Sequence, residues 1–147
     1  MPGRLEWIHV TDSAAAPMRA LERATLRAGI GIDGDRYAVD AGHWSGHPAG
    51  DRELTLVAGE VIDELGLAPG ASRRNLTTRG VDLDGLIGRE FIVGSVRCRG
   101  ERRCDPCTYL EGLIGRPILR DLVHRGGIRA SILTNGDVVV GDPIEAL

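Results

Sequence analysis

This sequence contains no lysine, and aromatic residues account for only 3% of its 147 positions. All 18 of its basic residues are therefore arginines, whose planar guanidinium suits bidentate contacts with phosphate or carboxylate groups. Proteins that bind single-stranded nucleic acid use aromatic side chains as stacking platforms, and such side chains are scarce here. The composition therefore argues against a nucleic-acid partner.

Cysteine and long apolar runs are scarce as well. The three cysteines are an odd number and no apolar leader follows Met1, so we do not expect a secreted disulfide framework. We expect a cytoplasmic protein, in which thiols stay reduced. No apolar run approaches the roughly 20 residues needed to cross a bilayer, so no membrane segment is expected. Residues 1–147 fit a single domain that folds without disulfide or metal staples.

The arginines are unevenly distributed along the chain. Residues 1–72 hold six arginines against eleven acids, whereas residues 73–129 hold twelve arginines against seven acids. The net charge of -3 hides this asymmetry. An anionic ligand would therefore bind more favourably to the second segment than to the first.

Short alternating segments separated by glycine dominate the pattern. The 21 glycines and many short strands predict a curved, closed or partly closed β structure, in which glycines serve bulges and corners. The rhythm of a doubly wound α/β sheet is not evident. Helical spacing is confined to three short segments, residues 59–67, 108–113 and 117–126. Strands are expected at residues 24–28 and 53–58, in a hairpin around Gly94, and in a second hairpin around Asn135-Gly136.

The cysteines allow three interpretations. Cys104 and Cys107 form a C-x-x-C pair that could be a redox motif, but such motifs belong near a βαβ unit and a β hairpin precedes this one. A structural zinc site needs four ligands, so a histidine such as His124 would have to join the cysteines, and no second ligand pair is present. Cys98 lies within an alternating strand and is most simply a small buried residue. One reactive cysteine is the third interpretation.

Several segments together resemble a known family. The order and spacing of "GIGIDGDRY", "ELTLVAGEVIDEL", "RRNLTTRGVDLDGLIGREFIVGSV", "RCDPCTYLE" and "RGGIRASILTNGDVVVGD" resemble the MOSC domain, which is named for the C-terminal domain of molybdenum cofactor sulfurases. The similarity is greatest to its small free-standing bacterial members, and it runs from about residue 5 to residue 143. It implies a mainly β, barrel-like fold with a few short helices, related to the barrel domain of pyruvate kinase.

The resemblance also implies one functional cysteine, which follows a proline near the end of the hairpin and is Cys107 here. In relatives that carry the molybdenum cofactor, this cysteine is the thiolate ligand to molybdenum, which makes Cys107 the candidate catalytic residue and metal ligand. A soft thiolate suits a soft metal centre and is also the nucleophile needed to take up sulfur. The neighbouring Arg102 and Arg103 would favour the thiolate over the thiol.

Arg73, Arg74 and Asn75 match the family's Arg-x-Asn segment, which contacts the pterin cofactor and its phosphate in cofactor-bearing relatives. The guanidinium fork matches phosphate, and an amide can both donate to and accept from a pterin edge. The alternative is that these arginines are solvated or form surface pairs.

The sequence departs from the family at Tyr37, which follows "GDR" where the family often has histidine, so no role of that histidine carries over. Asp35 and Arg36 are expected to form a structural ion pair or turn contact, because aspartate beside glycine is a common turn residue. His43 and His47 could line a pocket, or they could belong to a loop that covers one end of the barrel.

Three functions remain open from the sequence. The protein could bind molybdenum cofactor through Cys107 and reduce N-hydroxylated substrates with electrons from a partner. It could instead be a sulfur carrier that receives a Cys107 persulfide from a cysteine desulfurase, since 147 residues leave no room for a pyridoxal-phosphate domain of its own. The third alternative is an inert barrel used for protein contact. The N-terminal β-barrel domain of the amidoxime-reducing relatives is also absent from the sequence.

Overall fold

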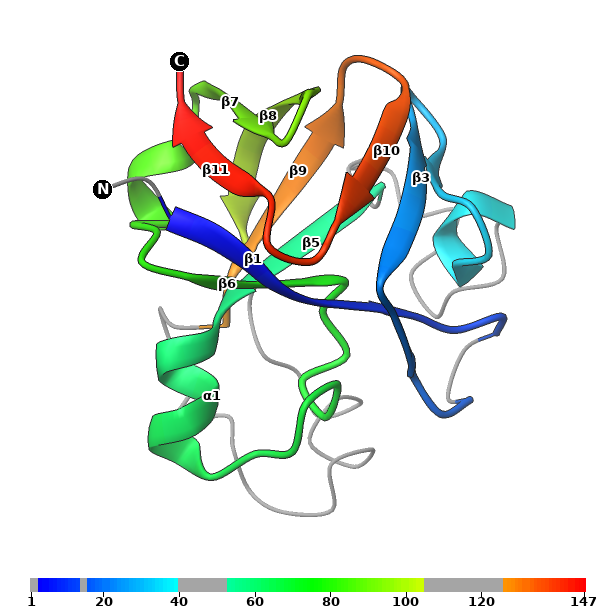
Figure 1. The fold of residues 1–147 in the computed structure, drawn as a ribbon, viewed down its shortest axis with the longest axis vertical. Coiled ribbons are helices and arrows are strands. Elements are labelled where there is room, and N and C mark those ends of the chain that lie inside the picture. The colour runs from blue at the N-terminus through cyan, green and yellow to red at the C-terminus, as the bar shows by residue number, and fades with distance from the viewer. Residues whose placement is uncertain (1–2, 14–15, 40–52, 105–125) are drawn as a thin grey trace.

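The computed structural model describes residues 3–13, 16–39, 53–104 and 126–147 (Figure 1). Its architecture is mainly β, as predicted, and no helix in this part of the chain is long and apolar enough to span a bilayer. In chain order the elements are β1 (Gly3–Val10), β2 (Arg19–Leu21), β3 (Arg23–Arg27), β4 (Gly31–Ile32), the 3-10 helix η1 (Arg36–Val39), β5 (Leu54–Ala58), α1 (Gly59–Leu65), β6 (Leu76–Arg79), the 3-10 helix η2 (Asp84–Leu86), β7 (Glu90–Val93), β8 (Val96–Arg103), β9 (Ile128–Ile132), β10 (Gly136–Val139) and β11 (Pro143–Ala146).

Seven strands close into a barrel. They follow the order β11-β7-β8-β9-β5-β6-β1, and β11 pairs with β1 to complete the ring (Figure 1). The closing register places Gly3 opposite Ile144. Neighbouring strands are antiparallel except for β5 and β6, which run parallel. The closed β structure predicted from glycine and short strands is confirmed.

Inward-facing side chains fill the barrel. Leu5, Phe91 and Ile128 are fully buried, and burial of each such side chain stabilises the fold by about 1.5–3 kcal/mol. The alternation in β1 is imperfect because a bulge lies between Leu5 and Trp7. The extra residue in the bulge returns the next apolar side chains, Ile8 onward, to the core face.

The predicted helix at residues 59–67 is confirmed as α1, which connects the parallel strands β5 and β6. It ends at Gly66, whose φ of 64° lies in the left-handed region that favours glycine. Arg79 ties α1 to the barrel. Its guanidinium donates to Glu6 on β1 at 2.8 and 2.9 Å and to Asp63 on α1 at 2.8 Å.

The hairpin predicted at Asn135-Gly136 is wrong, although a strand does lie on each side of Asn135. β10 pairs with β3 in a small sheet of order β10-β3-β4, and β9 pairs with β5 and β8. Neither Asn135 nor Gly136 has the positive φ that a tight hairpin turn requires. Asn135 instead accepts a hydrogen bond at its Oδ1 from the Ala28 N–H at 2.7 Å, which directs the chain toward β3.

The hairpin predicted around Gly94 is confirmed. β7 and β8 pair on either side of it, and Gly94 has a φ of 60°. The helical segments predicted to begin at residues 108 and 117 lie almost wholly outside the described residues.

Candidate functional site

The arginine run lies in a buried turn that enters β6. Arg73 and Arg74 are each 9% exposed and Asn75 is 1% exposed, so none of the three is a solvated surface residue. Burial of charged and polar side chains costs free energy unless hydrogen bonds or ion pairs compensate for lost water. The partners of these side chains therefore decide what each residue does.

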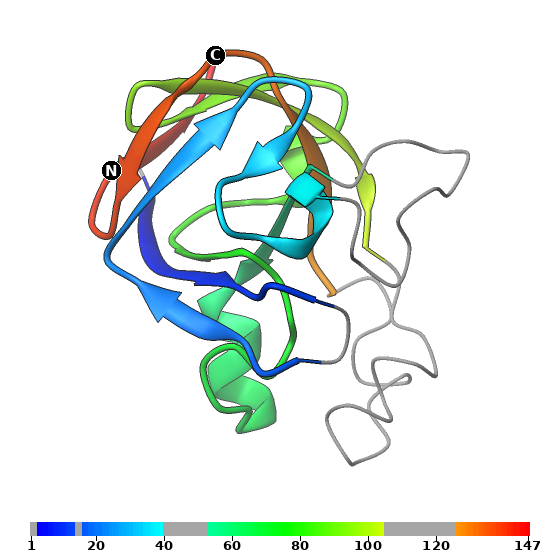
Figure 2. The same cartoon turned by 90° about the vertical axis from the view of Figure 1, so that its right-hand side faces the viewer.

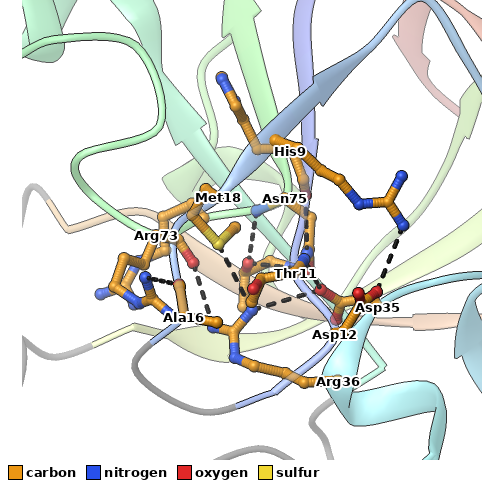
Figure 3. A network of polar contacts seen from close by, with 12 residues as sticks. His9, Thr11, Asp12, Ala16, Met18, Asp35, Arg36, Arg73 and Asn75 are labelled. Carbon is orange, nitrogen blue, oxygen red and sulfur yellow. Dashed lines mark hydrogen bonds and ion pairs between the residues drawn. The ribbon is translucent and has the colours of Figure 1, made fainter.

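The Asn75 side chain connects three strands of the barrel. Its Oδ1 accepts from the backbone N–H and from the hydroxyl of Thr55 on β5, both at 3.1 Å. Its Nδ2 donates to the carbonyl of His9 on β1 at 3.2 Å (Figure 3). These bonds commit the amide to the protein, so within the described residues Asn75 positions the arginine turn.

Arg73 holds the turn in an unusual backbone conformation. Its φ of 60° makes it the one residue other than glycine with a left-handed backbone in the described part of the chain. Its Nη1 donates to the Ala16 carbonyl at 2.7 Å, and its own carbonyl accepts from Arg36 Nη2 at 3.4 Å (Figure 3). Strain of this kind persists where surrounding contacts over-determine the backbone, and it is concentrated at functional sites.

Asp35 and Arg36 form the structural ion pair that the sequence predicted, with 3.3 Å between Oδ1 and Nη1. Asp35 is fully buried and also accepts the Thr11 N–H at 3.2 Å. Arg36 Nη1 lies 3.7 Å from the Met18 sulfur (Figure 3). The pair thus fastens the end of β1 and the segment after it to the arginine turn.

Arg74 reaches the two strand ends from which residues 105–125 depart. Its Nε donates to the Gly126 carbonyl at 2.8 Å. The Cys104 N–H donates to the Gly127 carbonyl at 2.8 Å, so the ends of β8 and β9 emerge side by side (Figure 2). We call Cys104, Gly126 and Gly127 the neck. Arg74 is therefore fixed at the neck of the segment that carries Cys107.

A second nitrogen of Arg74 is left over. Its Nη2 is buried and has no hydrogen-bond partner in the part of the chain that the structure describes. Position 126 requires glycine, because a Cβ there would lie 2.5 Å from the Cys104 carbonyl oxygen and 3.5 Å from Arg74 Nη2. A buried charged donor without an acceptor is a feature suited to an anionic ligand.

The two described cysteines are free and buried. Burial, with a smaller contribution from the Glu53 charge, raises the pKa of Cys98 to about 12, so this thiol stays protonated and unreactive at neutral pH. The prediction that Cys98 is a core residue is confirmed, since it is fully buried. Cys104 is 2% exposed. Cys107, His43, His47 and His124 lie outside the described residues.

No group of histidine, cysteine or acidic side chains within the described ranges could hold a metal ion. Cys107, the candidate metal ligand from the sequence, lies outside those ranges. Hard cations bind acidic oxygen ligands, whereas the guanidinium groups of the arginine turn are suited to anions.

His9 is a buried polar residue beside the arginine turn that was not among the site residues predicted from the sequence. Its imidazole stacks on Trp7, with 5.5 Å between ring centroids, and lies against Gly70 in the loop that leads to the arginine turn. The ring is 3% exposed, and Nδ1 has no hydrogen-bond partner among the described residues. Burial lowers the pKa of His9 below its ordinary 6.5. The β1 bulge places His9 on the face opposite Ile8 and Val10, and no local sequence pattern indicates that bulge.

Comparison with known proteins finds a family model that matches about two thirds of the chain and solved structures that match nearly all of it. A family model described as "MOSC domain" matches residues 49–145. No curated protein matches the sequence. Among solved structures, the YuaD protein from Bacillus subtilis matches with a TM-score of 0.79 and 21% identity, over 99% of this chain and 96% of that one.

Two structures of YiiM also match. The protein from Geobacillus stearothermophilus has a TM-score of 0.74 and 15% identity, over 99% of this chain and 75% of that one. The protein from Escherichia coli has a TM-score of 0.68 and 19% identity, over 98% of this chain and 69% of that one. At these identities the matches establish the barrel fold.

Proposed function

Because this chain belongs to the MOSC domain family, we propose that it binds molybdenum cofactor or a related anionic metal-sulfur species, with Cys107 as the sulfur ligand. The family is associated with molybdenum cofactor in general. The assignment of residues to an anionic cofactor is supported by the chemistry of the arginine turn and by its contact with the neck.

One observation carries the proposal. Arg74 donates its Nε to the Gly126 carbonyl in the neck, and its second, buried nitrogen Nη2 has no hydrogen-bond partner among the described residues. The cofactor's phosphate is an anion for which a guanidinium is a suitable partner. The described residues thus fit an anionic group near the segment that carries the candidate thiolate.

Each residue of the site would have a distinct part. Arg74 would bind and neutralise the anion, whereas Arg73 and Asn75 hold the turn through their bonds to Ala16, Thr55 and the main chain of β1. When bound, the cofactor would supply a two-electron redox centre. The concrete enzymatic version is the reduction of N-hydroxylated substrates with electrons from a separate protein.

Sulfur transfer is a second candidate function, favoured because Cys98 and Cys104 are buried and leave Cys107 as the candidate carrier. The Cys107 thiolate would attack the terminal sulfur of a persulfide on a cysteine desulfurase. A new sulfur-sulfur bond would form on Cys107 while the donor's sulfur-sulfur bond breaks, and the donor cysteine would leave as a thiolate. No external oxidant is needed.

Elemental analysis separates these functions. Protein from a host that makes molybdenum cofactor should contain molybdenum and pterin near one equivalent, and Cys107→Ser should lose at least nine tenths of the metal. Cys104→Ala is the matched control and should keep it. Undiminished molybdenum in Cys107→Ser would overturn the ligand assignment.

The carrier function is measured on the same variants after incubation with an active desulfurase and cysteine. Mass spectrometry should then find one added sulfur on Cys107 and none on Cys107→Ser. If the native protein contains neither metal nor persulfide, and Arg73→Ala and Asn75→Ala keep native protein contacts, the inert barrel is the correct alternative.

A further inference from the structure

We infer that a groove beside the neck, between α1 and the loop that follows β6, is the docking site for a basic segment of a partner protein. The segment would insert one apolar side chain into the groove and place an arginine or lysine on either side of it. The inference rests on the proposed function, because both candidate functions require a partner that reaches the segment carrying Cys107.

The groove has an apolar interior and borders the neck. Its volume is about 190 Å³, and Gly127 of the neck is among its lining residues. Its apolar lining consists of Ala58, Val61, Val81 and Leu83. Leu83 is buried, whereas the other three are half-buried and exposed to an incoming group. A dry cavity of about 150 Å³ can hold benzene, so this groove admits one apolar side chain.

Acidic residues surround the groove. Residues 59–66 and 80–88 contain five acids and no basic residue. Arginines of neighbouring strands neutralise two of these acids, Asp63 and Asp84. Asp82 lies in the rim itself, is exposed, and forms no ion pair with another described residue. The rim therefore keeps negative charge that a cationic side chain of a partner would complement.

The groove lies where a donor protein has to bind. The Gly127 carbonyl accepts the Cys104 N–H at 2.8 Å, and residues 105–125, which include Cys107, depart from this neck. A protein docked in the groove is therefore held beside the point where that segment leaves the barrel. Transfer of sulfur or electrons requires such positioning of the donor's reactive group.

The combination of apolar interior and acidic rim favours a different protein over a second copy of this chain. On β8, the exposed Arg97 and Arg99 flank Cys98, which is fully buried. This strand of a second copy thus offers positive charge without an apolar side chain between the two charges. A partner segment that carries both would fill the interior and pair with the rim.

The test uses the full chain and two synthetic peptides, acetyl-Gly-Arg-Leu-Arg-Gly-amide and its counterpart with glutamate in place of each arginine. The basic peptide should shift the amide resonances of Val61 and Gly127 saturably and bind at least tenfold more tightly than the acidic one. Its affinity should fall at least threefold at high salt, because salt screens the exposed rim. Equal affinity for the two peptides would overturn the inference. Shifts of the same resonances with protein concentration alone would assign the groove to a second copy and overturn it as well.

Variants assign the effect to the groove. Asp82→Asn removes the unpaired charge and keeps an acceptor for the Gly85 N–H, and Val61→Arg places a cation in the interior. Each should weaken binding of the basic peptide at least fivefold. Asp12→Asn, which removes an exposed acid after β1, is the control and should keep the native affinity. Native affinity in folded Asp82→Asn and Val61→Arg would contradict the inference.

A second experiment separates the inference from the proposed function by comparing two sulfur donors, a cysteine desulfurase and glutathione persulfide. Asp82→Asn should lower the ratio of the desulfurase rate to the small-donor rate at Cys107 at least threefold, because only the protein donor has a segment to dock. If neither donor modifies Cys107, the carrier function fails and the peptide titration still decides the inference. If both donors modify it and Asp82→Asn leaves the ratio unchanged, the inference fails and the carrier function stands.

Discussion

Arg73 shows how a single residue can carry a local cost for the sake of a site. A left-handed backbone costs a residue with a Cβ about 1–2 kcal/mol relative to the right-handed conformation, and glycine avoids most of that cost. Arginine nevertheless occupies the position, and its side chain and carbonyl are both bonded. The arginine run could be predicted from the sequence, but its backbone conformation could not, because tertiary contacts impose it.

Two substitutions at this position isolate the backbone cost. Arg73→Ala and Arg73→Gly both remove the bond to Ala16, but only alanine keeps the Cβ penalty. The free energy of unfolding of Arg73→Gly should therefore exceed that of Arg73→Ala by about 1 kcal/mol in urea denaturation. Equal stability of the two variants would show that the left-handed conformation is not the source of strain.

His9 predicts a pH dependence of stability. Its pKa is lower in the folded protein than the ordinary 6.5, so below pH 6.5 the unfolded chain binds more protons at this residue than the folded chain. Its contribution therefore lowers the free energy of unfolding as pH falls below 6.5, and the loss stops below the folded pKa. Above about pH 7.5 the imidazole is neutral in both the folded and the unfolded chain, so His9 no longer lowers the free energy of unfolding.

His9→Asn cannot take up that proton. Its denaturation midpoint should fall less steeply than that of the native protein between pH 7.5 and pH 5, whatever the offset between them at pH 7.5. Because the other titratable residues are shared, the difference in slope reports His9 alone. Parallel pH profiles would show that burial does not disfavour the charged imidazole.

In the neck, the packing of β9 against β5 requires glycine at position 127. Gly127 has a φ of 94°, and a Cβ there would lie 1.9 Å from the Leu56 carbonyl oxygen on the neighbouring strand β5. Gly29 has a φ of 73° but no heavy atom within 4 Å of an added Cβ. Substitutions at the two positions therefore separate the cost of a steric clash from the cost of a left-handed backbone.

Gly29→Ala should lower the free energy of unfolding by about 1 kcal/mol, because only the left-handed penalty applies. Gly127→Ala should lower it by about 3 kcal/mol or more, because the clash forces β9 away from β5 as well. Chemical denaturation measures both, and amide exchange at Cys104 should increase in Gly127→Ala alone. Similar costs at the two positions would contradict the close approach at the neck.

Elements were predictable where the signal is local. The helix that ends at Gly66 and the hairpin around Gly94 depend on short-range periodicity and on a glycine with positive φ. The hairpin at Asn135-Gly136 failed because its dipeptide also suits a connection between sheets, and the bond from Ala28 to Asn135 decides between the two. That bond spans residues far apart in the sequence, so no local pattern contains it.

At the scale of the whole molecule, the mainly β barrel followed from the short strands, the glycines and the family resemblance. The strand order did not, because β11 must pair with both β7 and β1 and no dipeptide specifies such pairings. The candidate site was predictable in part. The arginine run and the Asp35 to Arg36 pair were found from the sequence, whereas the link between Arg74 and Gly126 depends on the folded barrel.

The closure of the barrel by β1 and β11 also determines when the protein can finish folding. During synthesis the ribosome releases β1 early, and its partner at residues 143–146 follows only near the end of the sequence. Until then the nascent chain exposes an unpaired strand edge, which is the kind of surface that chaperones protect and that aggregation exploits. The pairing of β1 with β11 thus closes the finished barrel, but its edge stays open to aggregation until residues 143–146 have been synthesised.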